Sequence, residues 1–152
     1  MTFVAVASNG TELQTAMESI KLRLSLTDGP VDATINLCAN SIHLSRTLDV
    51  FGPNLTLTLQ PARLSSELCA LDEFADPAER RRTPRLKLSY ISDLMRVTLD
   101  AHRSFRAIRV REGARLIIRA GITVRNGRIS GTTFDSGHGA GILVEGLNTQ
   151  VE

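Results

Sequence analysis

The sequence predicts a coiled β-solenoid, a fold in which short strands stack turn upon turn, and two observations predict it. First, apolar residues occupy every second place in several short runs, as at 55–59, where three leucines alternate with two threonines. This period of two indicates a strand with one buried face. Second, the phrase at 108–113 returns at 142–146 with one residue deleted, and the pattern of 48–55 matches 108–116 within one residue. Such repetition is typical of stacked repeats.

An amphipathic helix is expected near the N-terminus, at 11–24. Thr11 and Gln14 have the spacing of a capping box, and apolar residues follow at helical intervals. A short strand at 2–8 precedes the helix. We expect the helix to be a cap, because the first turn of a solenoid would otherwise expose apolar surface.

Three short strands are expected within 32–61, and the alternating pattern returns at 97–101 and continues to the end. Between them, 62–95 breaks the pattern with prolines and an arginine run at 80–82, and we interpret it as an inserted loop. We expect 1–152 to be a single domain. Because a strand-like run reaches Glu152, we also expect an N-terminal fragment of a longer solenoid, whose uncapped last turn would favour self-association.

Charge is distributed unevenly along the chain. Residues 79–128 hold 14 Lys/Arg and 4 Asp/Glu, a balance of +10, whereas the remainder holds 4 and 12, a balance of −8, giving +2 in total. A basic face that attracts an anionic polymer would follow from this asymmetry, and a merely solvated arginine-rich surface is the alternative. Aromatic residues are only 4 %, which disfavours a protein that stacks sugars or bases on aromatic platforms.

The order of these elements resembles the right-handed parallel β-helix repeats of the pectin-lyase-like superfamily. The segments that carry the resemblance are VTLDA, FRAIRV, ARLIIRAGITVRNG and GAGILV, and it spans roughly 11–61 and 97–151. The polymorphic outer-membrane protein and adhesin type is the most similar, through 139–142, although the Asn expected three residues after Phe134 is absent. The resemblance implies an all-β right-handed parallel β-helix (β-solenoid) with a short N-terminal amphipathic α-helix as cap.

The segment Gly137-His138-Gly139 resembles the Gly-His-Gly of polygalacturonases in the same superfamily, and Asp135 lies nearby. Those enzymes use paired carboxylates as acid and base, and no second carboxylate of that kind is found here. His138 and Asp135 are therefore weak catalytic candidates. The alternative is that His138 belongs to a turn whose glycines supply unusual backbone angles.

Four arginines are expected to point outward beside inward apolar residues, among them Ile117 and Val124. Strands stack about 4.8 Å apart, so outward guanidinium groups would form a column that suits carboxylates or sulfates of a polysaccharide. The four candidate ligand-binding residues are Arg109, Arg111, Arg119 and Arg125.

No metal site and no cofactor are predicted, because the three histidines are scattered and no acidic cluster would hold calcium. We expect Asp100 and His102 to make a hydrogen bond at a turn rather than to act in catalysis. Cys38 and Cys69 are too few for a disulfide-built scaffold, and the sequence leaves open whether they form one bridge. We find no signal peptide and no membrane span, and expect no nucleic-acid partner.

Together these observations predict a non-enzymatic structural or adhesive module of a larger surface or extracellular protein; the location follows from the resemblance. One alternative is a polysaccharide-active enzyme of the polygalacturonase or lyase kind. The other is a binder of anionic polysaccharide through the arginine-rich face.

Overall fold

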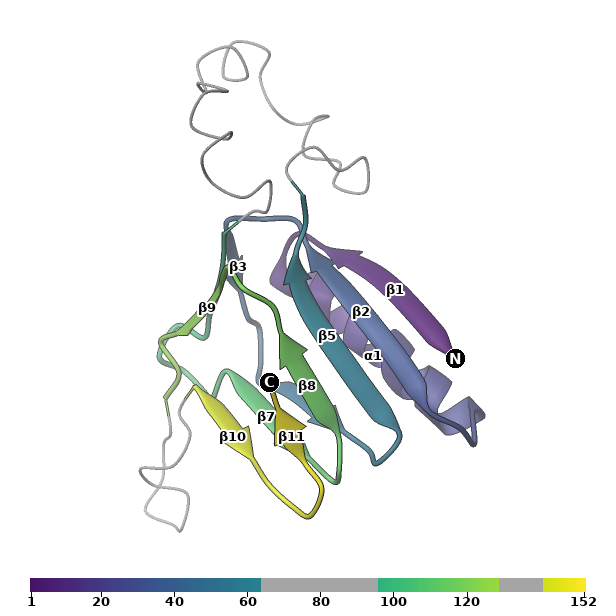
Figure 1. Cartoon of the computed structure of the whole chain (residues 1–152). Helices are drawn as coiled ribbons and strands as arrows, with labels where there is room; N and C mark the ends of the chain where they lie inside the picture. The colour runs from purple at the N-terminus through teal and green to yellow at the C-terminus, as the bar shows by residue number, and fades with distance from the viewer. Residues whose placement is uncertain (64–95, 129–140) are drawn as a thin grey trace.

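The structure, a computed structural model, describes residues 1–63, 96–128 and 141–152 (Figure 1). This part of the chain contains one helix, α1 (Gly10–Leu26), and eleven short strands. The strands are β1 (Thr2–Ala7), β2 (Val31–Leu37), β3 (Ser41–His43), β4 (Leu48–Phe51), β5 (Leu55–Pro61), β6 (Val97–Asp100), β7 (Ile108–Arg111), β8 (Arg115–Ile118), β9 (Ile122–Arg125), β10 (Ile142–Val144) and β11 (Gln150–Val151).

The strands form three separate sheets in which every described pairing is parallel. The largest has the order β1-β2-β5-β8-β11, and the two smaller ones have the orders β10-β7-β4 and β3-β6-β9. The register is regular: Leu57 of β5 lies between Ala33 of β2 and Leu116 of β8. Val110 of β7 likewise pairs with Val50 of β4 and Val144 of β10. The regular register therefore places like residues on like faces.

The structure corrects the predicted fold class. The described strands form three separate parallel sheets, no closed solenoid is detected among them, and a 17-residue helix contributes to the core, so the all-β β-helix prediction is wrong. The physical reason is that alternation identifies a strand and its buried face but does not specify how sheets join. The same pattern is compatible with several packings of parallel strands.

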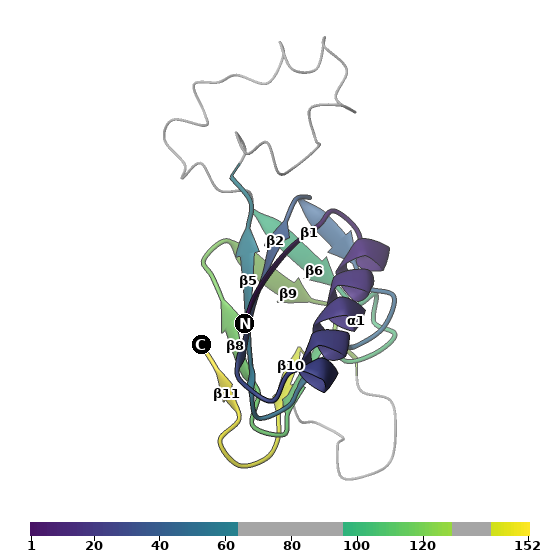
Figure 2. The same ribbon diagram turned by 90° about the vertical axis from the view of Figure 1, so that its right-hand side faces the viewer.

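The helix is longer than predicted and connects two neighbouring strands. β1 and β2 pair in parallel from Thr2 opposite Asp32 to Ala7 opposite Leu37, and α1 forms the crossover between them. Parallel neighbours need a connection of a dozen or more residues, which a hairpin cannot supply. Figure 2 shows α1 along one side of the sheets.

The start of α1 also differs from the predicted capping box at Thr11 and Gln14. Asn9 is the N-cap, and its side-chain Oδ1 accepts a hydrogen bond of 2.8 Å from the Glu12 backbone N–H. The Glu12 carboxylate in turn accepts the Ser8 N–H at 2.7 Å. Asn and Glu three residues apart satisfy orphan N–H groups as Thr and Gln would have done. The N-cap is therefore two residues earlier in the sequence than the N-cap at Thr11 that the predicted capping box implies.

Gly10 lets the helix start lie directly on the end of β3. A Cβ atom at this position would be 2.1 Å from the backbone oxygen of His43. Further along, α1 passes the end of β4, where Lys21 Nζ lies 5.6 Å from the ring centroid of Phe51. The helix thus runs beside β3 and β4, the edge strands of the two smaller sheets.

The core is aliphatic, as the low aromatic content predicts. Every second side chain of β5 is buried, and the helix contributes one face of four buried residues. The largest fully buried side chains are Leu13, Met17, Ile20, Ile35, Leu37, Ile42, Leu48, Leu57, Leu59, Leu99, Ile108 and Leu116. Burying one such side chain contributes about 1.5–3 kcal/mol.

Strands within 32–61 and at 97–101 are confirmed, but the structure has four strands in the first range, β2 to β5, where the sequence predicts three. One strand further along also differs in the face that it buries. Ile117 pairs with the outward Thr58, and its neighbour Leu116 is buried beside Leu57. The prediction that Ile117 faces inward is therefore wrong by one residue. Most of the predicted loop at 62–95 lies outside the described residues. Among the described residues no helix is both long and apolar enough to cross a membrane.

Candidate functional site

A groove of about 460 Å³ lies between α1 and the segments that lead into β4 and β7. Its lining is basic. Four cationic side chains and one carboxylate are accompanied by an amide, a hydroxyl and one aromatic ring. These residues are Gln14, Lys21, Arg46, Thr47, Asp49, Phe105, Arg106 and Arg109.

Two of the arginines occupy equivalent places on neighbouring strands. Leu48 of β4 pairs with Ile108 of β7, and Arg46 and Arg106 each precede that pair by two residues. The Thr47 hydroxyl donates a 2.7 Å hydrogen bond to the backbone oxygen of Arg106, and this bond ties the two segments together. Parallel pairing therefore brings two guanidinium groups to the same side of the groove.

Ion pairs hold three of the cationic side chains of the groove, those of Lys21, Arg46 and Arg109. Glu18 of α1 accepts from Arg46 at 3.1 Å and from Lys21 at 3.3 Å. A hydrogen bond from Gln14, followed by the effect of Lys21, lowers the pKa of the Glu18 carboxyl below its usual value. Arg109 pairs with Glu145 at 2.6 Å. Exposed pairs of this kind contribute only about 0–1 kcal/mol, so an incoming anion can replace the carboxylates.

The four predicted arginines do not form one column. Arg109 and Arg111 lie on β7, Arg125 ends β9, and Arg119 follows β8, so they belong to three different sheets. The column geometry is therefore wrong, and only Arg109 lines the basic groove. The predicted role of these residues in ligand binding remains a prediction.

Most of these arginines are engaged with carboxylates of neighbouring strands. Arg111 donates two hydrogen bonds to Asp49, at 3.1 and 2.9 Å, and also contacts Glu112. The bonds to Asp49 are the main cause of a raised pKa for Arg111. Arg125 donates to Asp100 at 3.0 Å. For Arg119, no ion pair is found within the described ranges.

The sequence contained a signal for Arg46 and Arg106. Aligning the repeated phrases at 48–55 and 108–116 places both arginines at the same distance before their strands. No comparable signal exists for Lys21, because its place beside the groove depends on how α1 packs against the sheets.

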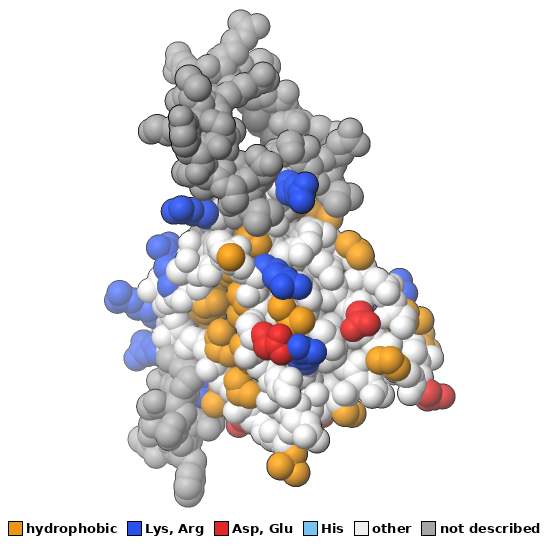
Figure 3. Space-filling view, viewed as in Figure 1, with side chains coloured by type: hydrophobic (Ala, Val, Ile, Leu, Met, Phe, Trp, Pro, Cys, Tyr) orange, Lys and Arg blue, Asp and Glu red, His pale blue; other side chains and the backbone are white. Residues whose placement is uncertain are grey.

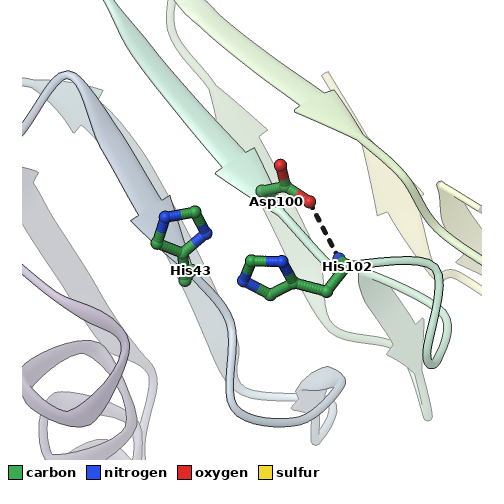
Figure 4. A group of neighbouring side chains, drawn as sticks. All are labelled: His43, Asp100 and His102. Carbon is green, nitrogen blue, oxygen red and sulfur yellow. Dashed lines mark hydrogen bonds between the residues drawn. The ribbon is translucent and has the colours of Figure 1, made fainter.

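A second polar cluster lies at the ends of β3 and β6. His43 and Asp100 pair in register, and His102 lies in the turn that follows β6 (Figure 4). The two imidazole rings stack with centroids 4.3 Å apart and planes 23° apart. One donor atom from each of the three residues lies within 4.8 Å of the other two. Both histidines are exposed, and Asp100 is buried. Of the described groups, this one could hold a metal ion.

Several donors hold Asp100 in its charged form. The His102 backbone N–H donates at 2.8 Å, and the Asn126 amide donates to both carboxylate oxygens at 3.1 Å. These bonds, that of His102 first, lower the pKa of Asp100 from 3.8 to about 2. The expected hydrogen bond at this turn is confirmed, and it joins the His102 backbone to the Asp100 side chain. His102 has φ +56°, a left-handed conformation that turns the chain back toward the strand end.

The weak catalytic candidates His138 and Asp135 lie outside the described residues. Cys38 takes part in a disulfide bond, whereas Cys69 also lies outside the described ranges. Comparisons with family models, with curated proteins and with solved structures found no match. The resemblance to the pectin-lyase-like superfamily therefore stays a prediction.

Proposed function

We propose that the protein is a non-enzymatic adhesive module that holds the anionic groups of a polysaccharide in the basic groove. The observation that carries the proposal is the composition of the groove lining, with Lys21, Arg46, Arg106 and Arg109 against the single carboxylate of Asp49. Guanidinium groups bind carboxylates and sulfates through forked, charge-assisted hydrogen bonds. Gln14 and Thr47 add neutral polar groups to the same lining.

The arrangement of the cations favours a ligand with more than one negative charge. They come from α1, from the segments before β4 and β7, and from β7 itself, so they surround the groove from several sides. A polymer with several anionic groups gains binding free energy from each such contact. Binding of this kind requires no catalytic group. The volume of about 460 Å³ lies within the range of about 300–1,000 Å³ typical of ligand pockets.

An extracellular or cell-surface location is part of the same proposal. The disulfide at Cys38 supports it, because disulfides form and persist mainly in oxidising compartments.

Binding to polygalacturonate or a sulfated polysaccharide, measured by calorimetry at several salt concentrations, tests the proposal. We expect affinity to fall steeply with ionic strength, because binding depends on charge pairing with exposed groups. The double variant Lys21→Gln/Arg46→Gln should bind about tenfold more weakly, since each exposed charge pair contributes up to about 1 kcal/mol.

The control is the double variant Arg96→Gln/Arg128→Gln, which removes the same charge from exposed positions outside the groove. This control should bind almost as tightly as the unmodified protein. Equal losses in both double variants would mean that net charge rather than the groove governs binding. Absence of binding at low salt would refute the proposed function.

A further inference from the structure

We propose that His43, Asp100 and His102 form a binding site for a divalent first-row transition metal, with Zn²⁺ as the best fit. The site is separate from the basic groove and does not depend on the function proposed for that groove. Two imidazoles and one carboxylate are a donor set that such metals prefer.

Strand pairing brings the three residues together across a long stretch of sequence. His43 ends β3 and Asp100 ends β6, and the parallel register places them opposite each other. Paired positions on neighbouring strands lie about 4.8 Å apart, which sets the scale of the site. The left-handed turn at His102 then brings a second imidazole over the first, as the stacked rings in Figure 4 show.

The distances are close to those that a metal ion requires. The three donor atoms lie within 4.8 Å of one another. Ligands about 2.0–2.2 Å from a tetrahedral zinc ion are separated by about 3.4 Å. Rotation of the two exposed imidazoles can close the difference without moving the strands. Three protein ligands leave a fourth position for water or for an external ligand.

The carboxylate is already oriented by its neighbours. The His102 N–H and the Asn126 amide fix Asp100 from two sides, in the manner of the outer hydrogen bonds that orient metal ligands. An ionised carboxylate offers about four lone-pair positions; these bonds occupy three of them, and Arg125 donates to the fourth. Its burial keeps its orientation fixed.

Arg125 supplies the positive charge that faces the Asp100 carboxylate. Its Nε lies 3.0 Å from Asp100 Oδ2, and its side chain is 56 % exposed, so it can move into solvent. A bound divalent cation would replace the guanidinium as the charge that faces Asp100. Removing the arginine charge should therefore strengthen metal binding, whereas a role limited to folding the turn predicts no such gain.

Calorimetric titration of the full, chelator-treated chain with Zn²⁺ alone tests the proposal. We expect one Zn²⁺ per chain in the unmodified protein. His43→Ala and His102→Ala should each weaken binding by at least about tenfold, because each removes one of three ligands. Both side chains are exposed, so the variants should keep the circular dichroism spectrum of the parent.

His138→Ala removes the remaining histidine of the chain and serves as the matched control, with retained binding expected. Arg125→Gln should bind Zn²⁺ several-fold more tightly than the parent. Unchanged affinity in the His43→Ala/His102→Ala double variant would overturn the proposal. Failure of the parent chain to bind Zn²⁺ at millimolar concentration would overturn it as well.

Discussion

Strands β5 and β9 have the same alternating pattern but not the same burial. Leu55, Leu57 and Leu59 of β5 are almost completely buried, whereas Ile122 and Val124 of β9 are only partly buried. β5 lies between β2 and β8 in the middle of the largest sheet, and β9 is one of the two edge strands of its sheet. The difference shows that alternation fixes which face is apolar, while the neighbouring layer decides how deeply that face is buried.

The two ends of the strand stack are covered differently. At the N-terminal end, α1 lies beside the edge strands β3 and β4 and buries Leu13, Met17 and Ile20. At the other end, β9, β10 and β11 are the edge strands, and their inward side chains remain partly exposed. Apolar side chains gather over β8, β9 and β10 on the face shown in Figure 3. At the N-terminal end, α1 thus covers apolar side chains that further strands would otherwise have to cover.

Placing a charge under the helix should have the largest effect. Leu13→Asp buries an unpaired carboxylate at a site that is 1 % exposed, so we expect a loss of more than about 3 kcal/mol in the free energy of unfolding. The variant should also self-associate, because the covered end becomes accessible. Urea unfolding and size-exclusion chromatography measure the two effects.

Leu22→Asp on the same helix, at a residue 60 % exposed, is the control and should change the free energy of unfolding by less than about 0.5 kcal/mol. Equal effects at the two sites would refute the covering role of α1.

A matched pair of core substitutions sharpens the comparison between inner and edge strands. Ile35→Ala on β2 removes a fully buried side chain and should cost about 2–5 kcal/mol. Ile122→Ala on β9 makes the same chemical change at a partly buried position and should lower the free energy of unfolding by less than about 2 kcal/mol. The reason is that folding removes less apolar area from water at this position. Chemical denaturation of both variants provides the values. A cost at Ile122 that matches the cost at Ile35 would show that β9 is as well covered as β2.

The smallest expected effect on the free energy of unfolding comes from the charge of Asp100, which residues at the end of the edge strand β9 contact. The His102 backbone N–H, followed by Asn126 and Arg125 at the end of β9, lowers the pKa of Asp100 to about 2. Since the folded pKa is below the ordinary value of 3.8, the ionised carboxylate stabilises the fold fully above about pH 4. This contribution is lost as the pH falls through about 2.

In the presence of a chelator, the unfolding free energy of Asp100→Asn should therefore fall less between pH 5 and pH 2 than that of the parent protein. Asp32→Asn, at an exposed position on β2, is the control and should follow the parent curve. Parallel pH curves for the parent and Asp100→Asn would contradict the stabilising role of the Asp100 charge.

Local features of the fold followed well from the sequence. The alternation at 55–59 predicts β5 and its buried face, and the apolar spacing after Gly10 predicts the buried face of α1. Thr11 and Gln14 predict an N-cap two residues too late because they offer the same spacing as Asn9 and Glu12. These features depend on neighbours within four residues, so the local sequence contains nearly all the necessary information.

The candidate sites followed less well. Arg46 and Arg106 could be found by aligning the repeated phrases, since the strands after them pair in register. His43 and Asp100 lie 57 positions apart in the numbering and do not belong to any recognisable spacing motif. Only the register between β3 and β6 brings them together.

The sequence by itself determined where strands and the helix form, which faces are apolar, and that the core is aliphatic, because these depend on local periodicity and side-chain type. The tertiary structure decided that the strands form three separate parallel sheets, that α1 connects β1 to β2, and that three of the four predicted arginines pair with carboxylates. The physical reason is that period-two patterns leave the pairing partner unspecified. Pairing is selected by the combined burial and hydrogen bonding of segments far apart in the chain, and this selection assembled both polar sites.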